Sequence, residues 1–396
     1  MNFSHSASVM SISTSSRRVI LDTFSPVSLP ELVKLVNSVK ASSCPLDIVP
    51  ASLFKNVFQV IGPSVLTLIN SSLASGIVPV YFKNAAIFPL LKKPQLDPSL
   101  WSSYRPISKV PLIAKLLEKI VAKQLIAALD KHSIFDKFQS GFRRAHSTET
   151  ALLRVSSDIL MNNDAGKCSV LLMLDLTSAF DTVDHHILLE RLKHWVGVSG
   201  TALEWFSSYL HNRSFSVVVP DFRSSSTSLT CGVPQDSVLG PLLFLIYLLP
   251  LQHIMGSFED ISYHCYADDI QLYISFKPQD LSKLQLLNDC LDSIKCWMAV
   301  NFLQLNEGKT EVLICALDRF VSQIVKALRP LSVYVKSSIR NLGVTFDSTF
   351  TLDGHVKPLV RSCFYHLRNV AKLRHHCYFS YTGFLLNLEY ILRSWS

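Results

Sequence analysis

The first regular pattern of apolar positions begins at Ser28, which can cap a helix, with Pro30 in the first turn. Apolar residues then recur at helical spacing at Leu32, Val33, Leu35, Val36 and Val39. Residues 108–131 give the clearest amphipathic pattern, with a stripe made of Leu112, Ile113, Leu116, Leu117, Ile120 and Val121. The lysines of this segment lie largely outside the stripe. The pattern favours a packed helix with a solvated lysine face over an RNA-binding face.

Two other segments predict strands that end in carboxylates. Residues 169–174 are almost entirely apolar and run directly into Asp175, which is typical of a strand buried on both faces. Residues 263–274 have β-rich arms around Asp268 and Asp269, and a tight hairpin would place this pair at its tip. Apolar and polar residues alternate in the second arm, which predicts a half-buried strand.

An acidic pair in a turn is usually just a solvated turn, because Asp is a common turn residue. Apolar arms change this expectation, since carboxylates beside a buried sheet need compensating charge. Mg²⁺ prefers such oxygen ligands, and Mn²⁺ is a possible substitute. Two ions about 4 Å apart can activate a 3′-hydroxyl and stabilise a departing pyrophosphate. That chemistry needs carboxylates from separate elements, as Asp175 and Asp268 would supply.

Composition narrows the class of protein only a little. The 396 residues are 48% hydrophobic, which excludes a disordered tail protein, and a net charge of +8 allows a polyanionic partner. The nine cysteines include no C-x-x-C, which favours reduced thiols. The Ser-rich beginning of the chain has no apolar signal region, and the apolar run 238–251 is 14 residues with two prolines. We therefore expect an intracellular protein with no membrane segment.

Seven motifs in order along the chain resemble those of reverse transcriptases from non-LTR (LINE-like) retrotransposons. Their residues are 104–107 (YRPI), 138–148 (FQSGFRRAHST), 174–188 (LDLTSAFDTVDHHIL), 232–241 (GVPQDSVLGP), 266–269 (YADD), 306–310 (NEGKT) and 341–344 (NLGV). The resemblance runs from about residue 28 to about residue 373. It is strongest to Jockey- or L2-type elements of vertebrate genomes.

The resemblance implies an α+β right-hand polymerase fold, with a palm of antiparallel sheet and helices, helical and β fingers, and a truncated thumb. It divides the chain into a disordered tail (1–27), a helical N-terminal extension (28–83), fingers and palm (84–350), and a partial thumb with an altered end (351–396). The implied activity is RNA-directed DNA synthesis by two-metal-ion nucleotidyl transfer. The implied partners are an RNA template, a DNA primer and dNTPs, and the implied site of action is the nucleus. Oligomeric state is not readable.

The resemblance also assigns roles to single residues. Asp175 and Asp268 would be direct metal ligands, and Asp269 would be a partly structural member of the same catalytic set. Phe180 would be the aromatic gate against a ribose 2′-hydroxyl, and Gln235 would lie against the incoming nucleotide and template.

Three basic residues and one turn complete the implied site. Arg143, with Arg105 as a weaker candidate, would neutralise the triphosphate, and Lys309 would lie near the leaving pyrophosphate. For Arg105 and Lys309, a surface salt bridge is the alternative interpretation. Leu342 and Gly343 match the primer-grip turn, and an ordinary hairpin glycine is the alternative there.

The chain departs from the family pattern at Asp236, where the family has glycine. Glycine suits a close backbone approach or a positive φ, and aspartate adds a negative charge near the expected triphosphate. Two like charges about 4 Å apart repel by roughly 4 kcal/mol at an effective dielectric of 20. Fewer than 30 residues precede the resemblance, so we expect no endonuclease before it, and after Leu373 the resemblance ends.

Two further hypotheses therefore stay open. The first is a catalytically impaired transposon remnant that at most binds nucleic acid, and the second is an RNA-directed RNA polymerase, which the YADD box and Phe180 disfavour. His185-His186 and His375-His376-Cys377 lack partners at metal-ligand spacing, so we interpret them as packed or exposed side chains.

Overall fold

The structure is a computed structural model that describes residues 18–39 and 44–373. Its helices are α1 (Leu29–Ser38), α2 (Ala51–Asn56), α3 (Phe58–Ser75), α4 (Leu112–Lys131), α5 (Thr148–Asp164), α6 (His185–Glu190), α7 (Gly200–Leu210), α8 (Gly240–Tyr247), α9 (Leu249–Gly256), α10 (Leu284–Val300), α11 (Asp318–Leu328) and α12 (Asp353–Leu373). Its strands are β1 (Asn84–Leu91), β2 (Tyr104–Lys109), β3 (Cys168–Leu174), β4 (Arg213–Val219), β5 (Phe222–Arg223), β6 (Thr227–Leu229), β7 (Ile261–Tyr266), β8 (Asp269–Phe276), β9 (Glu311–Cys315), β10 (Val335–Lys336), β11 (Ser338–Asn341) and β12 (Val344–Asp347). This mixed α and β content agrees with the predicted α+β class.

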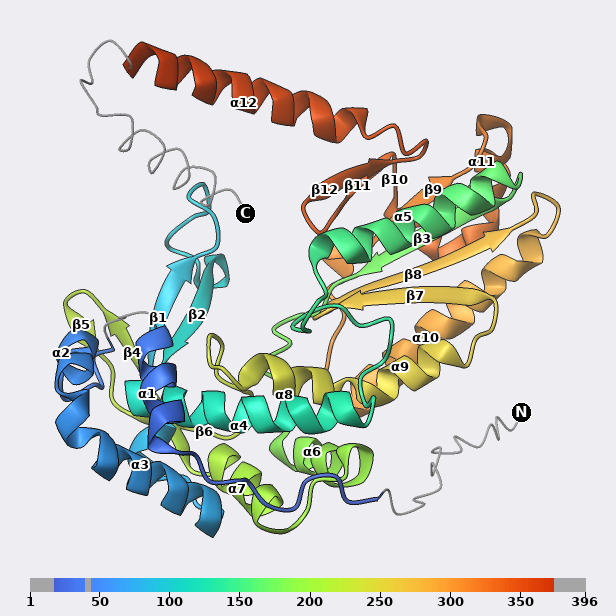
Figure 1. Cartoon of the computed structure of the whole chain (residues 1–396). Helices are drawn as coiled ribbons and strands as arrows, with labels where there is room; N and C mark the ends of the chain where they lie inside the picture. The colour runs from blue at the N-terminus through green and yellow to red at the C-terminus, as the bar shows by residue number, and fades with distance from the viewer. Residues whose placement is uncertain (1–17, 40–43, 374–396) are drawn as a thin grey trace.

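The sheet that carries the predicted carboxylates has the strand order β10-β9-β3-β8-β7. β3 lies in its centre and pairs antiparallel with both β8 and β9, so the apolar run 169–174 is buried on both faces as predicted. Leu171 belongs to a cluster with Val155 and Ile159 of α5, whereas Val170 and Leu172 belong to the main core on the opposite face. Figure 1 shows α5 lying across one face of this sheet and α10 running along the other.

A second sheet has the order β2-β1-β4-β5, with β6 also paired to β4. β1 and β2 form an antiparallel pair, and β4 joins β1 in parallel. α4 and α8 lie between this sheet and the carboxylate-bearing sheet, while α12 extends away beyond β11 and β12 (Figure 1). The two strand systems thus flank a central group of helices.

The helix predicted after Ser28 is present as α1. The Ser28 hydroxyl and the Glu31 carboxylate form a capping box, which satisfies backbone N–H groups that the first turn leaves without partners. The expected loose tail is wrong for residues 18–27, because Phe24 is buried against Trp205 and Phe206 of α7. Residues 1–17, and the predicted altered ending with His375, His376 and Cys377, lie outside the described residues.

The amphipathic helix predicted over 108–131 is shorter than expected. Residues 108 and 109 belong to β2, and α4 begins only after Pro111. Proline disfavours helical backbone at the residue that precedes it, so the helix does not extend back through this position. The expected solvated lysine face is only partly present. Lys115 and Lys119 are half-buried because other elements pack around α4, whereas Lys123 and Lys131 are exposed.

The second arm of the acidic hairpin is not half-buried. Gln271 and Tyr273, the polar positions of the alternation, are 0% and 2% exposed. The Tyr273 hydroxyl donates to Asp158 of α5, and the Asn341 amide donates to Gln271 from β11. The polar face of β8 is thus covered by α5 and the β11–β12 hairpin. These tertiary contacts cannot be predicted from the alternation of residues within the strand.

The apolar run 238–251 forms α8 and the first turn of α9, and its residues are predominantly buried. This agrees with the core segment predicted for it. Across the described ranges, every helix is too short or too polar to cross a bilayer.

Candidate active site

Asp175 directly follows β3, so the strand carries its carboxylate to the end of the sheet. Its backbone oxygen accepts from the Asn306 N–H at 2.8 Å, which ties this point to the loop before β9. Its Oδ2 accepts from Lys309 Nζ at 2.7 Å, in an ion pair whose carboxylate side chain is 19% exposed. The ion pair occupies the oxygen that the sequence predicts to be a metal ligand.

Asp268 lies in the tight turn between β7 and β8, as predicted. Tyr266 pairs with Asp269 across the strands, which leaves only Ala267 and Asp268 in the turn, and Ala267 has φ of 58°. Asp269 is therefore the first residue of β8, one position beyond the tip.

The loop between α4 and α5 (residues 132–147), which we call the finger loop, holds this turn in place. The Gln139 Oε1 accepts from both the Ala267 and the Gly141 backbone N–H, at 3.0 and 2.8 Å. Residues 138 and 140 add backbone hydrogen bonds to Cys265 of β7. Gly141 packs so closely that a Cβ there would lie 2.2 Å from the Ala267 nitrogen. The turn that carries Asp268 is thus held by a motif more than a hundred residues before it in the sequence.

The three carboxylates lie close enough to affect one another electrostatically. Burial raises the pKa of Asp268 and the nearby Asp175 raises it further, while Lys309 and Arg105 oppose the shift. Burial, followed by Asp268 and Asp175, raises the pKa of Asp269 to about 6. The positive charge of Lys309 and Arg105 is therefore not enough to offset the burial and mutual repulsion of these carboxylates.

These donors fit Mg²⁺, because they are hard carboxylate oxygens from two separate strand ends and lack sufficient counter-charge. Within the residues the structure describes, no three or more His, Cys, Asp or Glu side chains are already gathered as a metal-binding group. Asp175 forms an ion pair with Lys309 instead.

The motif around Phe180 and the loop before α8 lie side by side. The Val233 N–H donates to the Phe180 oxygen at 2.8 Å, and the Gln235 amide donates to both oxygens of Asp181. Phe180 is half-buried and stacks on Phe244 of α8, with centroids 4.9 Å apart. The core contact and the proposed gate are compatible, because only part of the ring is covered.

The predicted basic residues fall into two groups. Lys309 and Arg105 belong with the carboxylates, since both oppose the raised pKa of Asp268. Arg143 lies instead among finger residues: its Nη1 donates to the backbone oxygens of Asp136 and Gln139, and its guanidinium covers the Phe135 ring. Its Nη1 group thus holds the loop that contacts the Asp268 turn.

Three residues in the predicted motifs have positive φ. Leu342 and Gly343 form the two-residue turn between β11 and β12, both with positive φ (44° and 93°). Asp236 has φ of 70°, in the region that glycine adopts readily and other residues adopt at a cost. The Asp236 side chain is exposed, so water screens its charge and the repulsion is weaker than the sequence estimate.

Sequence reasoning missed several residues that support the site. Glu118 is buried in α4 and accepts from the Tyr209 hydroxyl and the Val238 and Leu239 N–H groups, which fixes the start of the segment leading into α8. The sequence feature that could have indicated a role for Glu118 is its position as a carboxylate within the apolar stretch of a predicted helix. Gln139 and Asp181 lie inside the motifs named above, but the sequence assigns them no role, because their roles depend on contacts with distant residues. His185 is buried and its Nε2 lies 2.8 Å from the Gly232 oxygen, in agreement with a packed histidine.

Residues 91–346 match the family "Reverse transcriptase (RNA-dependent DNA polymerase)". The match covers more than half of the chain, and the strand-end carboxylates lie within it, so the protein belongs to this family.

Individual relatives narrow the class to reverse transcriptases of non-LTR retrotransposons similar to jockey and the X-element. The "RNA-directed DNA polymerase from mobile element jockey" of Drosophila funebris is 30% identical over 353 residues, which are 85% of this chain and 37% of that protein. The "Probable RNA-directed DNA polymerase from transposon BS" of Drosophila melanogaster is 29% identical over 88% of this chain and 39% of that protein. The "Probable RNA-directed DNA polymerase from transposon X-element" of the same species is 30% identical over 67% of this chain. The chain spans about two fifths of the first two relatives. All three are fly proteins and give no support to the vertebrate origin expected from the motifs.

Proposed function

We propose that this chain is an RNA-directed DNA polymerase that adds dNTPs to the 3′-hydroxyl of a DNA primer annealed to an RNA template. The observation that carries the proposal is that Asp175, Asp268 and Asp269 lie at two adjacent strand ends, close enough for Asp175 to raise the pKa of both other carboxyls, with Lys309 and Arg105 nearby. The net charge of +8 suits a polyanionic hybrid bound through its backbone.

Each of these residues would have a role that follows from its position. Asp175 and Asp268 would hold two Mg²⁺ ions, or Mn²⁺ in their place, and Asp269 would complete the acidic set. Bound metal would lower the pKa of the primer hydroxyl and offset charge on the leaving pyrophosphate. Lys309, released from Asp175, would be available to the phosphates. Phe180 would close the space beside the ribose, and Gln235 would lie along the nucleotide. Arg143 would act chiefly by holding the finger loop.

Primer extension on an RNA template with Mg²⁺ and dNTPs tests this proposal. Asp268→Ala with Asp269→Ala should abolish extension, while Asp289→Ala with Asp292→Ala, an acidic pair on α10, should leave it unchanged. Equal loss in both double variants would point to misfolding and contradict the assigned roles. Preference for NTPs over dNTPs would instead support an RNA-directed RNA polymerase. Because non-LTR elements are copied at the chromosome, we also propose nuclear action, which fractionation of cells expressing the tagged chain would test.

The alternative proposal is an impaired remnant that retains nucleic-acid binding. Asp236 at positive φ is the observation that favours it. A folded protein that binds the hybrid but extends no primer, with or without Mn²⁺, would establish this alternative.

A further inference from the structure

The tip of the β1–β2 hairpin, residues 92–103, presents a large aromatic side chain to solvent. Trp101 is 86% exposed, and no described residue forms a hydrogen bond, a ring contact or a cation contact with its indole. The neighbouring Leu100 is also exposed, as is Leu90, which lies opposite Arg105 in the strand register. Tryptophan is highly buried on average in folded proteins, so an indole left in water indicates a contact surface.

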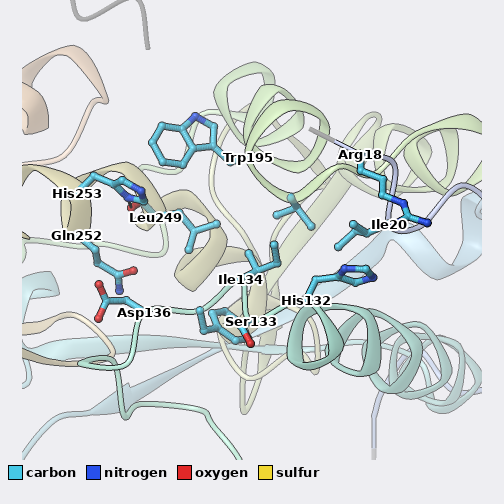
Figure 2. Close-up of a pocket in the computed structure, with 12 residues that line it drawn as sticks. Arg18, Ile20, His132, Ser133, Ile134, Asp136, Trp195, Leu249, Gln252 and His253 are labelled. Carbon is cyan, nitrogen blue, oxygen red and sulfur yellow. Dashed lines mark hydrogen bonds between the residues drawn. The ribbon is translucent and has the colours of Figure 1, made fainter. Parts of the chain in front are cut away.

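The aromatic and acidic groups of another hollow in the molecule already have partners. Figure 2 shows a cavity of about 450 Å³ whose lining includes Trp195, His253 and Asp136. Trp195 packs edge-on against His253, with ring centroids 5.1 Å apart, and Asp136 accepts from the Tyr263 hydroxyl at 2.6 Å. The indole of Trp101 lacks such contacts, so it is the better candidate for an aromatic side chain that contacts a ligand.

The loop that carries Trp101 is held by its own hydrogen bonds. The Lys92 N–H donates to the Ser103 oxygen at 2.9 Å, and the Lys92 ammonium group donates to the Ser102 oxygen at 2.8 Å. A 3₁₀ turn begins at Trp101, and the Ser103 N–H donates to the Leu100 oxygen at 3.0 Å. The indole is thus presented by a formed loop, and binding to a formed loop costs less conformational entropy than ordering a flexible one.

The same hairpin carries an excess of positive charge. Lys92, Lys93 and Arg105 are exposed on it, whereas Asp97 is the single carboxylate between residues 90 and 105. That carboxylate already accepts from the N–H and the hydroxyl of Ser99. An aromatic surface beside basic side chains suits single-stranded nucleic acid, whose bases stack on rings while its phosphates lie near positive charge.

Arg105 relates this tip to the carboxylates. Its charge opposes the raised pKa of Asp268, so β2 lies within electrostatic reach of the active site. Trp101 precedes Arg105 by four residues, which places it at most about 13 Å farther along the hairpin at the rise of a β-strand. Figure 1 shows the hairpin extending away from α4. A nucleic-acid strand that lies at Asp268 can therefore continue to the tip.

We propose that Trp101 is a stacking platform for an unpaired base of the RNA template, in the part of the strand that has not yet been copied. The base lies against the indole, and an adjoining phosphate lies toward Lys93. Stacking of this kind tolerates any base, so the contact suits a template of any sequence. The inference rests on the proposed polymerase function, because that function supplies a template with an unpaired region.

Fluorescence anisotropy with two labelled RNA–DNA hybrids of equal duplex length tests the proposal. One hybrid has blunt ends and the other has a 5′ overhang of unpaired RNA, which we expect to bind more tightly. Trp101→Ala should weaken binding of the overhang hybrid at least about fivefold and leave the blunt hybrid unchanged, as expected for loss of one base stack. Trp101→Phe keeps a ring and should retain most of the affinity. Lys93→Ala should lower the slope of log affinity against log salt for the overhang hybrid by about 1.

Phe222→Ala is the matched control. Phe222 is 66% exposed on β5, at the other end of the same sheet, so its removal should leave both affinities unchanged. Trp101→Ala should also keep the melting temperature of the native protein, because the indole packs against so little of the fold.

The binding measurement needs no catalysis, so its outcome is separate from that of primer extension. Trp101-dependent binding of the overhang in a protein that extends no primer would support this inference and contradict only the polymerase activity. Equal affinity of the native protein for both hybrids, or overhang binding that Trp101→Ala leaves intact, overturns the inference even if primers are extended. Self-association that Trp101→Ala abolishes, with overhang binding unchanged, would also overturn it and would identify the tip as an interface between copies of the chain.

Discussion

At the scale of single residues, Asp236 has an unfavourable backbone conformation in the loop before α8. Its φ of 70° places a non-glycine residue in the left-handed region, where an L-residue costs about 1–2 kcal/mol and aspartate somewhat less. Gln235, directly before it, holds Asp181 through its side chain and the Ser108 N–H through its backbone oxygen. Strain at this position therefore acts on the contacts that place the predicted nucleotide-binding glutamine.

Asp236→Gly should stabilise the protein by about 1 kcal/mol and raise nucleotide incorporation, because it removes both the strain and the negative charge. Urea unfolding and single-nucleotide extension measure the two effects. Asp236→Asn is the control that removes only the charge, since asparagine keeps the side chain and tolerates the same backbone. An incorporation rate that neither substitution changes would show that position 236 is not what limits this chain.

At the scale of elements, the turn that carries Asp268 is held by the packing of the finger loop against β7. Gly141→Ala would place a Cβ against the backbone of Ala267, so the turn or the loop must move. We expect primer extension to fall about a hundredfold, the effect of a displacement of about 1 Å at a reacting centre. Gly256→Ala is the matched control, because its Cβ would meet nothing closer than the Tyr263 hydroxyl at 3.6 Å. Full activity of Gly141→Ala would mean that the loop does not position Asp268.

The β11–β12 hairpin offers an independent prediction. Its two turn residues both have positive φ, a geometry in which Asn-Gly is preferred over Leu-Gly. Leu342→Asn should therefore stabilise the protein by roughly 0.5–1 kcal/mol in urea unfolding. If Leu342 contacts the primer, the same variant should also extend primers less well despite its greater stability. Unchanged unfolding would contradict the turn assignment.

The elements that the sequence predicts correctly are those whose signal is local. The apolar run into Asp175 and the β-rich arms around Asp268 are contiguous, so period and turn chemistry suffice to place the carboxylates at strand ends. The burial of Gln271 and Tyr273 comes from α5 and β11, which lie far away in the sequence. The role of Gln139 likewise depends on a tertiary contact with Ala267, and the Lys309 ion pair on the fold of the loop before β9. The alternation of apolar and polar residues within one strand does not indicate these long-range contacts.

At the scale of the whole molecule, His264 lies where the finger loop meets the palm sheet. It is 3% exposed, its Nε2 lies 2.9 Å from the Ser140 hydroxyl, and its Nδ1 is buried without a partner. Burial, with the nearby Arg154 and His146, lowers its pKa to about 4, while Asp136 and Asp158 oppose the shift. The fold thus requires this imidazole to remain neutral.

Stability should therefore depend on pH through this junction. Between about pH 6.5, where an unfolded histidine titrates, and pH 4, the unfolded chain binds a proton that folded His264 does not. Its contribution is fully present above that range and is lost as the pH falls, by roughly 2 kcal/mol between pH 8 and pH 5. His264→Gln should reduce the difference between urea unfolding free energies at the two pH values by about that amount. Asp268 and Asp269, with raised pKa values, act in the opposite direction and are common to both proteins, so they cancel in the comparison. An identical pH dependence in His264→Gln would show that protonation of this residue does not weaken the contact between finger loop and palm.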